Sequence, residues 1–271
     1  MSRHDRFAKH SLAPRTILIT GASGGVGAAL AQFYASPGQT LYLWGRNNAR
    51  LEAIAKICRE QGAQAIPRIV DLCDAPAALA AFRETEKETA LDLVILGAGV
   101  SDIRAADEKT EFPEIVLDTA MVNYATPVTL ATEAARHMVK RGYGAIGLIG
   151  SVAAFHDLPF ATAYSSSKAG LTRFATALHA SLKPHGVSVT IAAPGYIDTA
   201  MSRRLEGARP FLVSPEKAAF LIASAIAHKK TVVIFPKLFA FLKLVDALTP
   251  RRLAHALLRC VKVKQKPLSE S

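Results

Sequence analysis

Along almost the whole chain, short runs of apolar residues alternate with longer amphipathic stretches. Seven runs rich in β-branched and other apolar residues have the length of buried strands, at residues 16–20, 40–44, 65–70, 91–96, 145–149, 187–191 and 231–235. Six stretches between them repeat their apolar positions at helical spacing, at residues 25–35, 49–61, 76–85, 113–140, 162–183 and 215–227. These patterns predict seven strands joined by helices.

Strands that alternate with helices of this length predict right-handed crossovers and a parallel sheet. The strands are apolar throughout, as expected when helices cover both faces. We therefore expect an α/β fold with a doubly wound parallel sheet of the Rossmann type. No internal repeat or low-complexity linker divides the chain, so we expect a single domain over residues 15–235, with a flexible N-terminus (1–14) and a C-terminal helical extension (236–271).

The composition narrows the classes of partner. The chain has 33 Lys and Arg against 22 Asp and Glu, a formal net charge of +11, which favours either general solubility or a local anionic partner. No Cys/His finger spacing and no basic region with heptads occurs, so we expect neither a nucleic-acid partner nor a metal site. Cys58, Cys73 and Cys260 form no CxxC pair, which indicates reduced thiols and a cytoplasmic location. We expect no signal peptide and no membrane-spanning helix.

The extension after residue 235 combines positive charge with two amphipathic segments. From Lys237 onward it holds eight Lys and Arg, and only Asp246 and Glu270 as acids. One hypothesis is an interfacial helix within 236–266 that binds anionic lipid, peripheral to the inner face of a membrane. The alternative is that its apolar face packs on the protein's own body or across a dimer interface, with the charges solvated.

A glycine-rich turn joins the first expected strand to the first helix. Gly21, Gly25 and Gly27 follow the strand in TILITGASGGVGAAL. Glycine lets the backbone turn sharply and approach a diphosphate, and the N-terminus of the next helix offers free N–H groups and a positive dipole end. A tight strand–helix turn without a ligand would use the same residues, but the position after the first strand favours a dinucleotide site.

The end of the second expected strand indicates which dinucleotide binds. A site for NAD(H) usually has an acid here that binds the ribose 2′-hydroxyl, whereas this chain has Arg46. An arginine can pair with the 2′-phosphate of NADP(H), or it can be an ordinary surface residue. Asp71, after the third strand, could accept a hydrogen bond from the adenine amino group or cap the next segment.

The candidate catalytic residues follow later strands. Tyr164 and Lys168 are four residues apart in AYSSSKAGL, which places them on one face of a helix. A nearby ammonium is expected to lower the pKa of the tyrosine hydroxyl. Ser151 follows a strand, at the sheet edge where doubly wound folds place their sites, and Asn123 lies in a helical run.

The sequence resembles the short-chain dehydrogenase/reductase family over about residues 15–235. TGASGGVG resembles the family's cofactor loop, YSSSK its YxxxK motif, and 194–199 (PGYIDT) its PG segment. The resemblance implies that Ser151 binds the substrate carbonyl, Tyr164 protonates it, Lys168 holds the nicotinamide ribose and Asn123 holds a water in a proton relay. It also implies NADP(H) contacts at Gly21, Ser23, Gly25, Val26, Gly27, Arg46, Asp71, Leu72, Gly99, Asn123, Tyr164, Lys168, Pro194, Gly195, Ile197 and Thr199.

The sequence departs from the family pattern after the fourth strand, where Leu96-Gly97-Ala98-Gly99 replaces Asn-Asn-Ala-Gly. We expect altered support of the sheet there and unchanged chemistry. The substrate pocket is expected to use 101–109, 152–160 and 200–211, where three arginines could attract an anionic substrate or be solvated.

The function indicated is an NADP(H)-dependent reductase of a small ketone or aldehyde, or the reverse alcohol dehydrogenase, in a homodimer or homotetramer. One alternative is a 3-oxoacyl carrier-protein reductase. For this alternative Arg136 matches one carrier-docking arginine, but His185 stands where the other would be. A second alternative is a dinucleotide-sensing binding protein without turnover.

Overall fold

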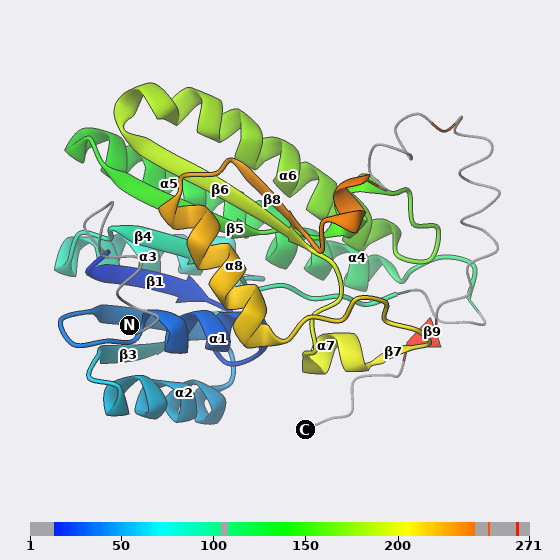
Figure 1. The fold of residues 1–271 in the computed structure, drawn as a ribbon, viewed down its shortest axis with the longest axis horizontal. Helices are drawn as coiled ribbons and strands as arrows, with labels where there is room; N and C mark the ends of the chain where they lie inside the picture. Colours follow the sequence, from blue (N-terminus) through cyan, green and yellow to red (C-terminus); the bar gives the residue numbers. More distant parts are fainter. Residues whose placement is uncertain (1–13, 104–107, 242–248, 250–263, 266–271) are drawn as a thin grey trace.

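The computed structural model describes residues 14–103, 108–241, 249 and 264–265. At its centre lies a seven-stranded parallel sheet with the order β3-β2-β1-β4-β5-β6-β8 (Figure 1). Its strands are β1 (Thr16–Thr20), β2 (Thr40–Gly45), β3 (Gln64–Ile69), β4 (Leu93–Leu96), β5 (Gly144–Ile149), β6 (Val187–Pro194) and β8 (Val232–Phe235). All seven expected strands are confirmed.

Helices cover both faces of the sheet. One apolar core joins the sheet to α1 (Gly25–Tyr34), α2 (Asn48–Glu60) and α8 (Pro215–Ala227). The other core joins it to α3 (Ala75–Glu88), α5 (Thr126–Arg141) and α6 (Thr162–Leu182). In Figure 1, α8 crosses one face of the sheet while α5 and α6 lie against the other. The sheet is therefore doubly wound, which confirms the expected fold class.

The direction in which successive strands are added to the sheet reverses between β1 and β4. β2 and β3 lie on one side of β1, and β4 and the later strands lie on the other. Helices that leave these two strands cover opposite faces, so a crevice opens at the carboxyl ends of β1 and β4. β1, β4 and β6 are buried along their whole length, which makes the floor of this crevice rigid.

The stretch 113–140, expected as one helix, is interrupted by a π turn. The structure has α4 (Pro113–Ala120), a π turn (Met121–Ala125) and α5. Pro127 explains the interruption, because it cannot donate to the carbonyl of Asn123 four residues earlier and its ring crowds that oxygen. The Thr126 N–H bonds instead to the Met121 carbonyl, five residues back. The π turn, which has one residue more than a turn of α-helix, contains Asn123.

Short elements surround the carboxyl edge of the sheet. They are a 3₁₀ turn (Val152–Phe155), α7 (Ala200–Arg203), and a small antiparallel pair of β7 (Leu205–Glu206) with β9 (Lys264–Gln265). The sequence pattern did not predict this pair. A second 3₁₀ turn (Lys183–His185) follows α6 and directly precedes β6, at the amino edge of the sheet. The second amphipathic segment of the tail, at 250–263, lies outside the described residues. Within the described part of the chain no helix is both long and apolar enough to cross a bilayer.

Candidate active site

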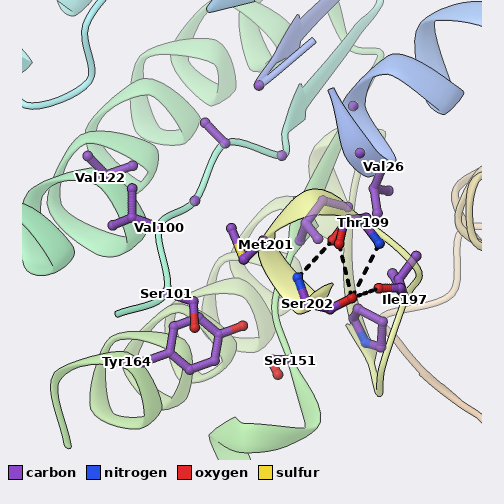
Figure 2. Close-up of a pocket in the computed structure, with 18 of the residues that line it drawn as sticks. Val26, Val100, Ser101, Val122, Ser151, Tyr164, Ile197, Thr199, Met201 and Ser202 are labelled. Carbon is purple, nitrogen blue, oxygen red and sulfur yellow. Dashed lines mark hydrogen bonds between the residues drawn. The ribbon is translucent and has the colours of Figure 1, made fainter. Parts of the chain in front are cut away.

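A cavity of about 860 Å³ lies at the carboxyl ends of β1, β4, β5 and β6. Its wall includes every site residue expected from the sequence except Asn123. Figure 2 shows Tyr164, Ser151 and Ser101 in one part of this pocket and Val26, Ile197 and Thr199 in another. The glycine loop and the candidate catalytic residues, far apart in the sequence, therefore share one cavity.

The glycine loop has room for backbone only. Gly21 has φ +73°, and a Cβ there would lie 2.7 Å from the Ala98 Cα. A Cβ on Gly27 would lie 2.2 Å from the Gly21 carbonyl oxygen. Gly25 has φ +55°, in the left-handed region that favours glycine. These contacts hold the loop against the chain that follows β4, and the loop lines the cavity with main-chain atoms.

The N-terminus of α1 suits an anion. α2, α3 and α8 begin with a side-chain cap from Asn47, Asp74 and Ser214, but the structure shows no such cap on α1 in the described residues, and its first turn has no acid. Gly25, Val26 and Gly27, in that turn, line the cavity. Since the first N–H groups of a helix lack partners within it, this turn can hold a diphosphate at the positive end of the dipole.

Two arginines lie where the cavity reaches the end of β2. Arg46 is exposed and lines the cavity, as expected. Arg50, one helical turn later in α2, lines it too, although the sequence analysis did not assign it. Asp71 also lines the cavity, and one of its carboxylate oxygens accepts a bond from the Cys73 N–H at 2.9 Å, as in a local turn. The arginine pair gives this end of the cavity a positive charge.

The catalytic side chains come from the end of β5 and the first turns of α6. Ser151 follows β5, and its Oγ accepts a hydrogen bond from the Ala153 N–H at 3.1 Å. Tyr164 and Lys168 lie one turn apart in α6, with the Lys168 Nζ 5.8 Å from the centre of the tyrosine ring. Lys168 is 4% exposed, and its Nζ donates to the Ile149 carbonyl at 3.0 Å.

The sequence led us to expect that Lys168 lowers the pKa of the Tyr164 hydroxyl, and the structure differs from this expectation. Burial raises the pKa of the Tyr164 hydroxyl, and the group that lowers it in part is Ser151, through a hydrogen bond, rather than Lys168. Burial also lowers the pKa of Lys168 to about 8, because an ammonium is poorly solvated there. At neutral pH Lys168 is therefore still mostly protonated, and its positive charge lies beside the tyrosine ring. A tyrosine that stays protonated is suited to donate a proton.

Asn123 lies behind the cavity wall, since its side chain is fully buried and holds the main chain of Val100. Its Oδ1 accepts from the Val100 N–H at 2.9 Å, and its Nδ2 donates to the Val100 carbonyl at 2.9 Å and to the Ser167 Oγ at 3.3 Å. In this structure Asn123 supports the segment after β4 and is not part of the cavity wall, and its contact with the cofactor stays a prediction. The water relay stays a prediction.

At the departure from the family's Asn-Asn-Ala-Gly, a threonine of β1 binds the main chain. The buried Thr20, at the end of β1, accepts hydrogen bonds from the Gly97 and Ala98 N–H groups at 3.1 and 3.2 Å. Gly99 leaves space for its neighbours, because a Cβ there would lie 3.2 Å from the Asn123 Oδ1. These bonds tie together the carboxyl ends of the two strands that form the crevice, and the altered support stays a prediction.

The arginines of the segment after β6 are engaged with carboxylates. Arg203 and Arg209 both pair with Asp198, at 2.8 and 3.5 Å. Arg204 pairs with Asp102 at 2.7 Å, and both of these side chains are mostly buried. Asp102 neutralises Arg204, whereas Arg203 and Arg209 share the single carboxylate of Asp198, so these pairs leave one positive charge uncompensated.

Two site features were not found from the sequence. Phe239, assigned there to the tail, lines the cavity and packs edge-to-face on Phe211. Glu111 caps α6, since its Oε2 accepts from the Thr162 hydroxyl and from the N–H groups of Thr162 and Ala163 at 2.9 and 3.1 Å. Phe239 meets Phe211 across 28 positions of sequence and Glu111 meets Thr162 across 51, so no local pattern shows either contact.

A doubly wound sheet with a glycine loop and a Ser-Tyr-Lys cluster at its switch point defines a dinucleotide oxidoreductase. The family model for short chain dehydrogenase matches residues 15–209. The chain belongs to this family, whose members act on CH–OH and C=O groups.

Known proteins are similar over most of the chain. An uncharacterized oxidoreductase of Myxococcus xanthus (strain DK1622) is 31% identical over 82% of this chain and 87% of its own length. Estradiol 17-beta-dehydrogenase 11 of Mus musculus is 29% identical, over 94% of this chain and 87% of its own. A solved structure of a short-chain dehydrogenase from Sphingobium yanoikuyae in complex with NADPH is 26% identical. Its TM-score is 0.75, and the match covers 94% of this chain and 98% of that one.

Proposed function

We propose that this protein is an NADPH-dependent reductase of apolar ketones or aldehydes, with Tyr164 as the proton donor. The observation that carries the proposal is the meeting of Ser151, Tyr164 and Lys168 in one cavity with the glycine loop and two arginines. The same residues would catalyse the reverse oxidation of a secondary alcohol.

Ser151, Tyr164 and Lys168 each have a separate role in the proposed reduction. Ser151 Oγ donates a hydrogen bond to the substrate oxygen and holds it beside the Tyr164 hydroxyl. When bound, NADPH would supply the hydride that reduces the carbonyl carbon. Tyr164 transfers its proton to the carbonyl oxygen as negative charge develops there. Because the pKa of Tyr164 is raised, its hydroxyl is protonated before the transfer. Lys168, fixed by the Ile149 carbonyl, holds the ribose and stabilises the tyrosinate that results.

The preference for NADPH rests on Arg46 and Arg50. Both line the cavity at the end of β2, where an acid would select NADH. A guanidinium pairs with a phosphate through charge-assisted and often bidentate hydrogen bonds. The Sphingobium yanoikuyae relative was solved with NADPH, which supports the same choice here.

The apolar substrate is inferred from the wall around Tyr164. The cavity that holds Tyr164 is lined in part by the apolar side chains of Val100, Ile103, Leu158, Phe160, Met201, Leu205 and Phe239. Hydrophobic walls with a few polar groups are typical of sites that orient an apolar ligand through one functional group. The relative estradiol 17-beta-dehydrogenase 11 is named for a hydrophobic steroid alcohol, which agrees with this inference.

The test is NADPH oxidation with a panel of apolar ketones, short polar ketones and a 3-oxoacyl thioester, using Tyr164→Phe as the matched control. Loss of one general acid should lower kcat by about 10²–10⁴ while NADPH affinity stays nearly unchanged. The apolar ketones should show the highest kcat/KM. Wild-type turnover by Tyr164→Phe would refute its role. NADPH binding without turnover of any substrate would favour the sensing protein instead, and preference for the thioester would favour the carrier-protein reductase.

A further inference from the structure

The segment that follows β4 is held between two carboxamide side chains. Asn123 pairs with both main-chain groups of Val100 on one side, as described above. On the other side the Gln265 Nε2 donates to the Ser101 carbonyl at 2.7 Å, and the Gln265 Oε1 accepts from the Ile103 N–H at 2.8 Å. The Gln265 side chain thus bonds to the segment as the peptide group of a neighbouring strand would.

The position of Gln265 is fixed by main-chain pairing. β9, which contains it, is antiparallel to β7, with Gln265 opposite Leu205. β7 belongs to the segment after β6, and Leu205 lines the cavity. Gln265 therefore connects the two segments that form opposite parts of the substrate wall, one after β4 and one after β6. The chain reaches back over more than 160 residues to make this contact.

An ion pair ties the same two segments a second time. Asp102 lies between the two residues bound by Gln265, and its carboxylate pairs with Arg204 at 2.7 Å. Arg204 directly precedes β7. Val100, Ser101 and Ile103 all line the cavity, so the main chain held by Asn123, Gln265 and Arg204 is the wall that contacts substrate.

We propose that Gln265 is a positioning residue that completes the substrate pocket from the C-terminal end of the chain. The inference rests on the proposed function, because it assigns the wall at 100–103 to substrate. The carboxamide of Gln265 supplies both the donor for the Ser101 carbonyl and the acceptor for the Ile103 N–H in one planar group. Without it, the side-chain attachments of this wall that remain among the described residues are those to Asn123 and Arg204, and the pocket loses its defined shape on the substrate side.

The first test is kinetic and compares Gln265→Ala with Gln265→Glu. Loss of two hydrogen bonds that shape the pocket should raise KM for the best ketone roughly five- to fiftyfold. kcat should stay within about threefold and the Kd for NADPH within about twofold, because Gln265 contacts neither the glycine loop nor Tyr164. Gln265→Glu should behave like Gln265→Ala, since its carboxylate cannot donate to the Ser101 carbonyl. Gln61→Ala, an exposed glutamine at the end of α2, is the matched control and should leave all three constants unchanged.

The second test does not depend on turnover. Hydrogen exchange at the Ile103 amide should become at least about tenfold faster in Gln265→Ala and stay unchanged in Gln61→Ala, because the amide loses its acceptor. Unchanged exchange at Ile103, or an unchanged KM with faster exchange, would overturn the inference. A wild-type protein that binds NADPH but reduces no ketone would instead contradict the proposed function, and the role of Gln265 in substrate binding would fall with it.

Discussion

At the scale of single residues, Arg46 is the residue expected to decide between the two nicotinamide dinucleotides. Arg46→Ala should weaken NADPH binding roughly ten- to hundredfold and leave NADH binding within about twofold, because only NADPH carries the 2′-phosphate. Arg50→Ala should have the same sign and a smaller effect, since Arg50 lies a turn further along α2. Fluorescence titration with both cofactors measures these constants.

Arg173→Ala is the control for general electrostatics, because Arg173 is exposed on α6 and lies outside the cavity wall. It removes the same charge from the protein. Equal losses of NADPH affinity in Arg46→Ala and Arg173→Ala would show that net charge, not a local contact, attracts the cofactor.

Lys168 is expected to support activity at a cost in stability. Its pKa is about 8 in the folded chain, below its ordinary value of 10.5, because it is buried. The folded state therefore binds this proton more weakly than the unfolded state. Below pH 8 both states are protonated and the full penalty applies, and between about pH 8 and 10.5 the penalty declines as pH rises. Lys168→Met should thus be inactive yet more stable at pH 7, by about 1–3 kcal/mol.

Urea unfolding at pH 7 and pH 10 measures this effect, and the stability advantage of Lys168→Met should nearly vanish at pH 10. Lys140→Met, at an exposed position of α5, should show no such dependence. A Lys168→Met protein that is less stable than the wild type at pH 7 would show that the bond to the Ile149 carbonyl outweighs the burial of charge.

At the scale of elements, the catalytic helix α6 depends on a cap from a distant loop. Glu111 accepts from the first N–H groups of α6, two residues before Tyr164, at the positive end of the helix dipole. Glu111→Ala should lower the free energy of unfolding by about 1–2 kcal/mol, and Glu111→Gln by less because it keeps an acceptor. The rate should fall with the loss of order around Tyr164.

Chemical denaturation and kcat measure the two effects. Glu114→Ala serves as the control, because Glu114 is an exposed acid in the first turn of α4 without this long-range contact, so its loss should cost at most about 0.5 kcal/mol. Equal losses of stability in the two variants would mean that Glu111 contributes only its charge.

At the scale of the whole molecule, the described part of the tail favours packing over lipid binding. Phe239 lines the cavity, contacts Phe211 and approaches Gly195, where a Cβ would lie 2.6 Å from its ring. β9 pairs with β7. The charge pattern of residues 250–263 remains the argument for lipid. We expect that full-length protein does not float with vesicles containing phosphatidylglycerol at 150 mM salt, a concentration at which the Debye length is about 8 Å.

Neutral phosphatidylcholine vesicles and a chain that ends at Phe235 are the controls. Flotation of the full-length chain with anionic vesicles alone, lost on truncation, would support the interfacial helix. Without flotation, a truncated chain that keeps NADPH binding but loses ketone reduction would support the packing interpretation.

The sequence determined the fold class and the main elements, because buried parallel strands and amphipathic helices leave strong local periodicities. It also pointed to Gly21, Arg46 and Ser151, which follow strand ends, and to Tyr164 and Lys168, which form a short motif on one helix face; all five line one cavity. Tertiary structure decided what depends on contacts across the chain. The π turn at Asn123, the low pKa of Lys168, the cap from Glu111 and the Gln265 contacts all arise from burial or pairing between distant segments. Pro127 was the one local signal for the π turn, whereas the two-residue β9 is too short for any periodicity to show it.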